Sequence, residues 1–344
     1  MTISVIIPVY KVEKYVRRCI ESVIAQECDK FNVECIIVDD CTPDGSMAIV
    51  QDVIDNYQGT SVSFNVLHHE VNKGLSNARN SGIKVATGDF LFFIDSDDFI
   101  MENTFKSFVS CFVGRPNVDV IVGNSLWVEN NYLTNTPINN NDSAPMYIDD
   151  KRKIIELVLR RRIDRNVWNK LIRRSLVIDN EIFFVSGMLY EDVIWTYKMY
   201  SCASSVLIAP GLTYMYENNP SSIIHTPQER SNQMVWSFAN IVEYLLENPP
   251  VIDGKKSFFA AHHLFAHYWT QKAIYLYDKF GADTETTNKL KSIKRTLLKD
   301  AFLHVRPFMV LYFLVMFAPF NVLMKSELFR RNLDRINRVV YMLS

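Results

Sequence analysis

Several features that mark whole classes of protein are absent from the sequence. None of the six cysteines forms a CxxC pair and most lie inside apolar patterns, which indicates reduced thiols in a cytosolic protein and no disulfide framework. There is no GxGxxG motif of a dinucleotide oxidoreductase, and no Gly-rich loop of a nucleotidyltransferase follows the first apolar run. Residues 1–8 carry neither a basic region nor a cleavage site, so we expect a strand there and not a signal peptide.

No sign of charge predominates either. The 37 Lys and Arg residues balance 38 Asp and Glu residues, and the formal net charge of -1 provides no field that would recruit nucleic acid. An anionic ligand must therefore be held locally. With 48% hydrophobic residues, the 344-residue chain can form one large α/β domain and a helical extension.

Short β-branched and aromatic runs alternate with helical patterns in the first third of the chain, which is typical of a sheet covered by helices. The four predicted strands are Val5 to Ile7, Glu34 to Val38, Ser63 to Leu67 and Phe90 to Ile94. Apolar residues at helical spacing predict helices around residues 16–24 and 49–57, and a third over residues 75–86. We expect Thr42 to cap the second helix, with Pro43 in its first turn, and Gly88 to close the third.

The second half of the chain is more irregular before it becomes helical. Residues 134–143 read as an Asn-rich loop and residues 149–163 as a helix, and from about residue 228 the pattern is almost wholly helical. We therefore predict a catalytic domain over residues 1–225, divided into a nucleotide-binding half (1–123) and an acceptor half (124–225). A helical extension over residues 226–344 follows.

Three carboxylates follow the fourth predicted strand within four residues, at Asp95, Asp97 and Asp98. In open α/β sheets ligands collect at the carboxyl ends of strands. Ionised carboxylates this close repel one another, and Mg²⁺ or Mn²⁺ can neutralise them while taking further ligands from diphosphate oxygens and water. Taken alone, the motif is equally compatible with a helix cap or a turn.

Other residues expected at the same edge suit a nucleotide. Asp39 follows the second strand and can accept a hydrogen bond from a uracil imide, and Tyr10 can stack on the base. Lys73 and Arg79 can meet phosphates. Capping, simple packing and solvated helix charges are the alternatives for these residues.

In this order, four segments resemble family-2 glycosyltransferases of the GT-A fold: residues 4–10, 38–40, 72–82 and 93–98. The resemblance implies a Rossmann-like mixed sheet flanked by helices. It also implies that Pro8, Val9 and Tyr10 line the nucleoside pocket, that Asp39 contacts uracil, and that Arg79 lies near base or phosphate. The implied nucleotide-sugar site also includes Lys73, Asp95, Ser96 and Asp97, and the implied metal ligands are Asp97 and Asp98. The motif can be registered as Asp95-x-Asp97 or as Asp97-Asp98.

Two later segments extend this resemblance. Residues 189–193 are similar to the segment that supplies the catalytic base in the family, which implies that Asp192 takes the proton of the acceptor hydroxyl; an acidic first helical turn is the alternative. Residues 168–171 resemble a segment near the donor and acceptor sites. There Trp168 can stack on a sugar and Lys170 can face phosphate, or they can be a buried Trp and a surface Lys. Glu191 is expected in the same vicinity.

The expected function is therefore metal-dependent, inverting transfer of a sugar from a UDP-sugar to an acceptor hydroxyl in polysaccharide or glycoconjugate assembly, with GDP- and dTDP-sugars as other donors. A catalytically inactive nucleotide-sugar or polysaccharide-binding subunit is the alternative, and the combination of the aspartate cluster with Asp192 argues against it. His263 and His267 are expected to be packed side chains and not metal ligands.

A stretch without charged residues lies near the end of the sequence, over residues 307–324. Basic residues flank it on both sides, and Pro319 interrupts it. This pattern suggests peripheral docking on the inner face of the cytoplasmic membrane, where a lipid-linked acceptor can be met. A buried or oligomeric helix is the favoured alternative, because the stretch is near the lower length limit for spanning a bilayer.

Overall fold

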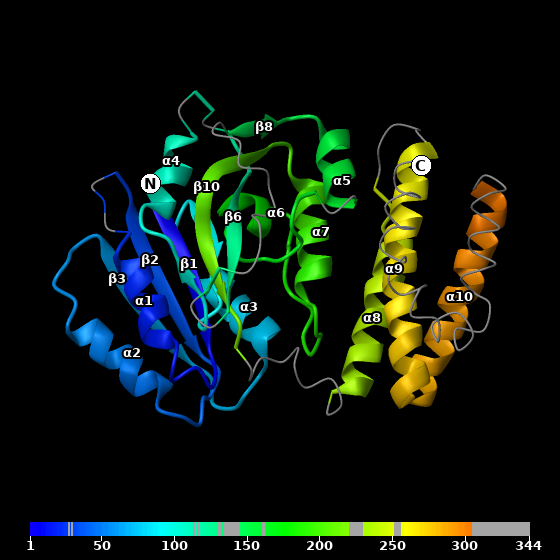
Figure 1. Cartoon of the computed structure of the whole chain (residues 1–344), viewed down its shortest axis with the longest axis horizontal. Coiled ribbons are helices and arrows are strands. Elements are labelled where there is room, and N and C mark those ends of the chain that lie inside the picture. Colours follow the sequence, from blue (N-terminus) through cyan, green and yellow to red (C-terminus); the bar gives the residue numbers. More distant parts are fainter. Residues whose placement is uncertain are drawn as a thin grey trace. The chain divides into compact units, whose positions relative to one another are not determined.

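A computed structural model describes residues 1–26, 28, 30–112, 114–115, 117–129, 132–133, 145–159, 162–219, 230–250 and 256–304. The chain divides into two compact units, residues 1–222 and 223–344 (Figure 1). Each unit is described by itself. The sheet and the candidate site belong to the first.

A mixed sheet forms the centre of the first unit, in the order β3-β2-β1-β4-β9-β6-β10-β5, with β7 beside β6 and β8 beside β10. Strands β1, β2, β3 and β4 run parallel, whereas β9 is antiparallel to both β4 and β6. The strands are β1 (Thr2–Val9), β2 (Asn32–Asp39), β3 (Val62–His68), β4 (Phe90–Phe93), β5 (Phe99–Ile100), β6 (Val120–Glu129), β7 (Tyr132–Leu133), β8 (Met146–Ile148), β9 (Lys170–Arg173) and β10 (Val206–Glu217).

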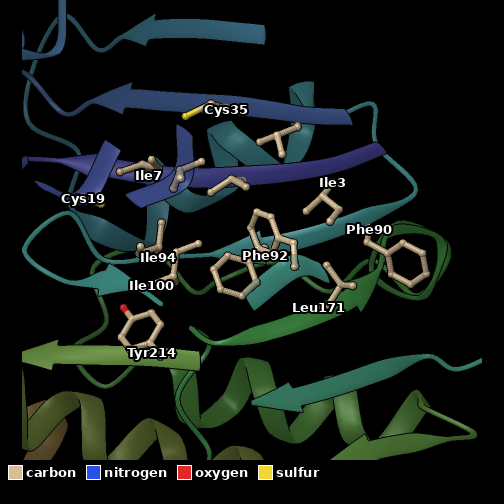
Figure 2. Packing of buried hydrophobic residues seen from close by; sticks show 14 of the residues in the cluster. Ile3, Ile7, Cys19, Cys35, Phe90, Phe92, Ile94, Ile100, Leu171 and Tyr214 are labelled. Atoms are coloured by element: carbon tan, nitrogen blue, oxygen red, sulfur yellow. The ribbon is translucent and has the colours of Figure 1, made fainter. Parts of the chain in front are cut away.

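Helices cover both faces of this sheet because its central strands are apolar on both sides. They are α1 (Val16–Ile24), α2 (Ser46–Asp55), α3 (Leu75–Val85), α4 (Thr104–Ser110), α5 (Lys151–Leu159), α6 (Arg174–Asp179) and α7 (Asp192–Cys202). Ile3, Val5 and Ile7 of β1 pack in one core cluster with residues of α1, α2 and α4. Figure 2 shows part of that cluster, with Tyr214 of β10 among its members. Ile6 belongs to the opposite cluster, with residues of α3, α5, α6 and α7.

The four predicted strands and the three helices between them are confirmed, but two helix boundaries differ from the prediction. Helix α2 begins at Ser46, because the Thr42 hydroxyl donates to Asp44 Oδ1 (2.7 Å) in a local turn and does not cap the helix. Helix α3 ends at Val85, before Gly88. Gly88 is needed for close approach instead, since a Cβ there would lie 2.6 Å from Ser4 Oγ.

The second unit is helical in the residues described, with α8 (Ser231–Glu247), α9 (Lys256–Phe280) and α10 (Thr284–His304). Helix α8 buries the predicted apolar face, which consists of Met234, Phe238, Ile241, Val242 and Leu245. Among the described helices, none combines the length and the apolar character needed to cross a membrane. Residues 307–324 and the side chains of His263 and His267 lie outside the described part of the chain.

Candidate active site

The carboxyl ends of β1, β2 and β3 lie next to one another, because Val9 pairs with Asp39 and Asp39 with His68 across the parallel strands. The residue Lys11, just beyond β1, and Cys41, just beyond β2, have φ values of 55° and 56°. Such left-handed backbone is uncommon for these residue types and turns the chain sharply at this edge. Strand β4 ends beside β1, because Ile6 pairs with Phe93, so the strand ends that carry Tyr10, Asp39 and the aspartate cluster share this edge of the sheet.

Asp39 presents its carboxylate at this rim. Its Oδ1 accepts a hydrogen bond from the Thr42 amide (2.8 Å), and its Oδ2 lies 3.0 Å from Nδ1 of His68. The His68 side chain is 64% exposed. Sequence analysis did not select His68, although it lies one residue beyond the third predicted strand. The ring of Tyr10 is also exposed, whereas Pro8 and Val9 are buried in β1.

Asp40 is a second residue that sequence analysis did not single out. It is 3% exposed and accepts hydrogen bonds from the backbone amides of Lys73 and Gly74, both at 2.8 Å. His69 Nδ1 lies 2.7 Å from Asp40 Oδ1, and His69 Nε2 lies 2.9 Å from Ser81 Oγ. This buried network fixes the loop before α3. The backbone amide of Lys73 is therefore held in place, while the side chain of Lys73 is exposed.

Asp98 is the most buried carboxylate of the aspartate cluster, at 1% exposure. Its Oδ2 accepts a hydrogen bond from the Tyr214 hydroxyl (2.6 Å), and its Oδ1 accepts one from the Glu217 amide (2.8 Å). Burial, together with the charges of Asp97 and Asp95, raises the pKa of Asp98 well above its usual value. Both oxygens thus have protein donors, which fixes Asp98 within the site.

Asp97 is only partly buried, beside the buried Ser96. Its Oδ2 accepts a hydrogen bond from the Asn219 amide group (3.0 Å). Burial and the neighbouring Asp95 raise the pKa of Asp97 to about 6. In the described part of the chain, no group of three or more His, Cys, Asp or Glu side chains is placed to hold a metal ion. A cation that takes most of its ligands from diphosphate and water needs only one or two carboxylates from the protein.

Arg79 does not extend into solvent. Its side chain is 2% exposed, with Nη2 2.6 Å from Asp95 Oδ1 and Nη1 bonded to Glu191 Oε1. The guanidinium also lies over the ring of Phe184, 5.4 Å from its centroid. Arg79 therefore connects the aspartate cluster to the segment that carries Asp192.

Asp192 is the first residue of α7 and is partly buried. Burial and the adjacent Glu191 raise the pKa of Asp192 to about 7, while Arg79 and Arg165 oppose the shift. A carboxyl group with a pKa near neutrality can take and release a proton at neutral pH, as a general base requires. Asp192 is thus chemically suited to the predicted role.

Trp168 and Lys170 have different surroundings. The Trp168 ring stacks on Tyr214, with centroids 4.4 Å apart and an interplanar angle of 13°. Because Tyr214 donates to Asp98, Trp168 packs directly behind the cluster. Lys170 is buried, and its Nζ donates to the carbonyl and side-chain oxygens of Asn166 at 2.6 and 2.7 Å. Lys170 thereby fixes the turn before β9. Burial lowers the pKa of Lys170 to about 8.

The family model and the relatives that match this chain all indicate the same family of proteins. The family described as Glycosyl transferase family 2 matches residues 4–180. The glycosyltransferase EpsH of Bacillus subtilis is 31% identical over 232 residues, which cover 66% of this chain and 64% of EpsH. GlyG of Streptococcus pneumoniae is 28% identical, over 65% of this chain and 73% of GlyG. The poly(ribitol-phosphate) beta-N-acetylglucosaminyltransferase TarS of Staphylococcus aureus is 28% identical, over 63% of this chain and only 35% of TarS.

Two solved structures share the fold. Residues 1–349 of S. aureus TarS, crystallised with UDP-GlcNAc, superpose with a TM-score of 0.63 at 22% identity, over 87% of this chain and 81% of that one. The mannosyltransferase PcManGT of Pyrobaculum calidifontis, in complex with GDP-Man and Mn²⁺, gives a TM-score of 0.54 at 12% identity, over 99% and 86% of the two chains. The predicted GT-A fold, a mixed sheet flanked by helices, is confirmed.

Proposed function

Because the chain belongs to glycosyl transferase family 2, we propose that it transfers a sugar from a nucleotide diphosphate sugar to an acceptor hydroxyl in polysaccharide or glycoconjugate assembly. One observation carries the proposal: Arg79 joins Asp95 of the aspartate cluster to Glu191, next to Asp192. A donor-binding carboxylate cluster and a carboxyl group suited to proton transfer thus belong to one connected site.

A UDP-sugar is the donor that we propose. The carboxylate of Asp39 stands at the rim, where it can accept a hydrogen bond from the imide of uracil, and Tyr10 offers an exposed ring beside it. TarS was crystallised with UDP-GlcNAc and is a beta-N-acetylglucosaminyltransferase, which supports this choice. PcManGT was crystallised with GDP-Man, so a GDP-sugar is the donor to compare.

We propose that Asp97 holds Mg²⁺ or Mn²⁺ together with the donor diphosphate. When bound, the cation stabilises the negative charge on the departing diphosphate. Asp98, predicted as a second ligand, accepts a hydrogen bond on each carboxylate oxygen, one from Tyr214 and one from Glu217. This favours a supporting role in which Asp98 orients the loop. Asp95 is held in place by Arg79.

Asp192 acts as the base in this proposal. Its carboxylate accepts the proton of the acceptor hydroxyl while the oxygen attacks the anomeric carbon from the face opposite the diphosphate, and such in-line attack inverts the configuration. The raised pKa of Asp192, about 7, makes its carboxylate a stronger base than that of an ordinary aspartate.

The experiment is a screen of UDP-, GDP- and dTDP-sugars for binding and for release of the nucleotide diphosphate, with and without Mn²⁺. Asp97→Asn is expected to lose donor binding, whereas Asp192→Asn is expected to bind the donor and to lose transfer. Asp55→Asn, at the exposed end of α2, is the matched control. Full transfer by Asp192→Asn would remove that residue as the base. Donor binding without any turnover by the wild type would favour the inactive binding subunit.

We also propose peripheral membrane docking through residues 307–324, on the strength of the sequence pattern alone. A chain lacking residues 300–344 should then sediment less with anionic vesicles than the full chain does. Equal sedimentation of the two chains would refute the docking and leave the proposed transfer untouched.

A further inference from the structure

We propose that Arg79 is a positioning residue. It links the aspartate cluster to the acceptor-side segment, residues 184–191, and thereby holds Asp192 in place for proton transfer. The role rests on the proposed function. This role differs from the phosphate contact that the sequence predicted for Arg79. It also makes α3 an anchor for residues 184–191, which the sequence did not predict.

Arg79 joins segments that are distant in the sequence. One amino group of the guanidinium contacts Asp95, two residues after the end of β4, and the other contacts Glu191, directly before α7. The planar fork of an arginine suits such bridging, whereas a lysine presents a single point charge. The Glu191 side chain is 9% exposed, so removing Arg79 leaves this carboxylate buried without its charged partner, which is strongly unfavourable.

Neighbouring residues of α3 hold the same acceptor-side segment. Asn80 makes two hydrogen bonds with the backbone of Phe184, one to its carbonyl (2.9 Å) and one from its amide (2.8 Å). Asn77 donates to Ser186 Oγ (2.8 Å). Three residues of α3 therefore contact the chain between Phe184 and Glu191, and Arg79 is the charged one among them.

The surroundings of the guanidinium disfavour direct phosphate binding. Both of its terminal amino groups already have carboxylate partners, and its face lies against Phe184. A donor phosphate would have to displace one of these buried pairs. The same charges instead surround Asp192, together with Arg165 and with Lys170, which interacts electrostatically with it.

The two partners of one ion pair act on Asp192 in opposite directions. Glu191 raises the pKa of Asp192, whereas Arg79 lowers it. Arg79→Met and Glu191→Gln both break the Arg79–Glu191 pair, but the first removes a positive charge near Asp192 and the second removes a negative one. A purely structural role of the pair gives no reason for opposite effects on the acid side of the pH–rate profile.

The test uses the full chain, the donor found by the screen (UDP-GlcNAc as the first probe), and UDP release as a function of pH. We expect the acid limb to move up by about one pH unit in Arg79→Met and down in Glu191→Gln. We expect kcat of Arg79→Lys to fall by about a hundredfold, with an unchanged acid limb and an unchanged KM for the donor, because lysine keeps the charge but cannot hold both carboxylates. Arg17→Met, which breaks an exposed arginine pair with Asp52, is the control.

Several outcomes overturn the role. Acid limbs that shift in the same direction, or not at all, contradict it, and so does Arg79→Lys with wild-type kcat. A raised donor KM with unchanged kcat identifies Arg79 as a phosphate contact instead. Should Arg79→Met fail to fold, Arg79→Lys and Glu191→Gln decide the question. A wild type that releases no nucleotide diphosphate from any donor of the screen overturns the proposed function itself, whereas the other outcomes overturn only the role of Arg79.

Discussion

Burial determines how strongly Asp192 holds its proton, and this sets the pH at which the proposed transfer works. The pKa of Asp192 is about 7, raised first by burial and then by Glu191. Only the deprotonated carboxylate can accept the proton of the acceptor, so kcat/KM should fall as the pH drops below about 7 and level off above it. The profile of UDP release through the neutral range checks this. A flat profile down to pH values where an ordinary aspartate is half protonated would contradict it.

Asp39 permits a separate prediction about the base of the donor. Asp39→Asn keeps the shape of the side chain but removes the charge that strengthens the proposed hydrogen bond to uracil. We expect the affinity for UDP to fall by about tenfold or more, and the affinity for GDP to change much less. Calorimetric titration of both nucleotides measures the difference, with Asp55→Asn as the control. Equal losses for UDP and GDP would show that Asp39 does not read the base.

The pair Asp39 and Asp40 shows how far sequence reasoning reaches at this scale. Adjacent residues at the end of a strand point to opposite sides. The sequence places both aspartates at the end of the second strand, and the position of Asp39 there and the resemblance to the family both single out Asp39. It could not predict that Asp40 holds the amides of Lys73 and Gly74, or that Arg79 is buried, because those contacts depend on how α3 packs against the sheet.

Helix α3 packs unusually close to β1, and Gly82 makes this possible. A Cβ at position 82 would lie 2.5 Å from Cγ2 of Ile6, a distance that forces the helix or the strand to move. We expect Gly82→Val to lower the free energy of unfolding by about 1–3 kcal/mol, and to lower transfer because α3 also carries Arg79. Urea unfolding measures the first effect. Lys84→Ala, at an exposed position of the same helix, is the control, and unchanged stability of Gly82→Val would contradict the close packing.

Elements with a clear local pattern were predictable, and elements that depend on distant partners were not. Short apolar runs and helical spacing located β1 to β4 and α1 to α3 within a few residues. Strand β9 lies antiparallel between β4 and β6, so its place depends on partners far away in the sequence. Helix α2 begins later than the predicted Thr42 cap implies, because Thr42 donates its amide to Asp39 and its hydroxyl to Asp44.

At the scale of the whole molecule, the site and the cores that support it lie within the first unit. The core clusters on the two faces of the sheet and every proposed donor-binding residue belong to residues 1–222. We therefore expect a chain ending at residue 222 to fold cooperatively and to bind UDP as tightly as the full chain, because binding energy comes from residues that it retains. Thermal unfolding followed by calorimetric titration with UDP measures both properties. If the shortened chain folds but does not bind UDP, the second unit contributes to the donor site, and residues 1–222 are not a complete nucleotide-binding unit.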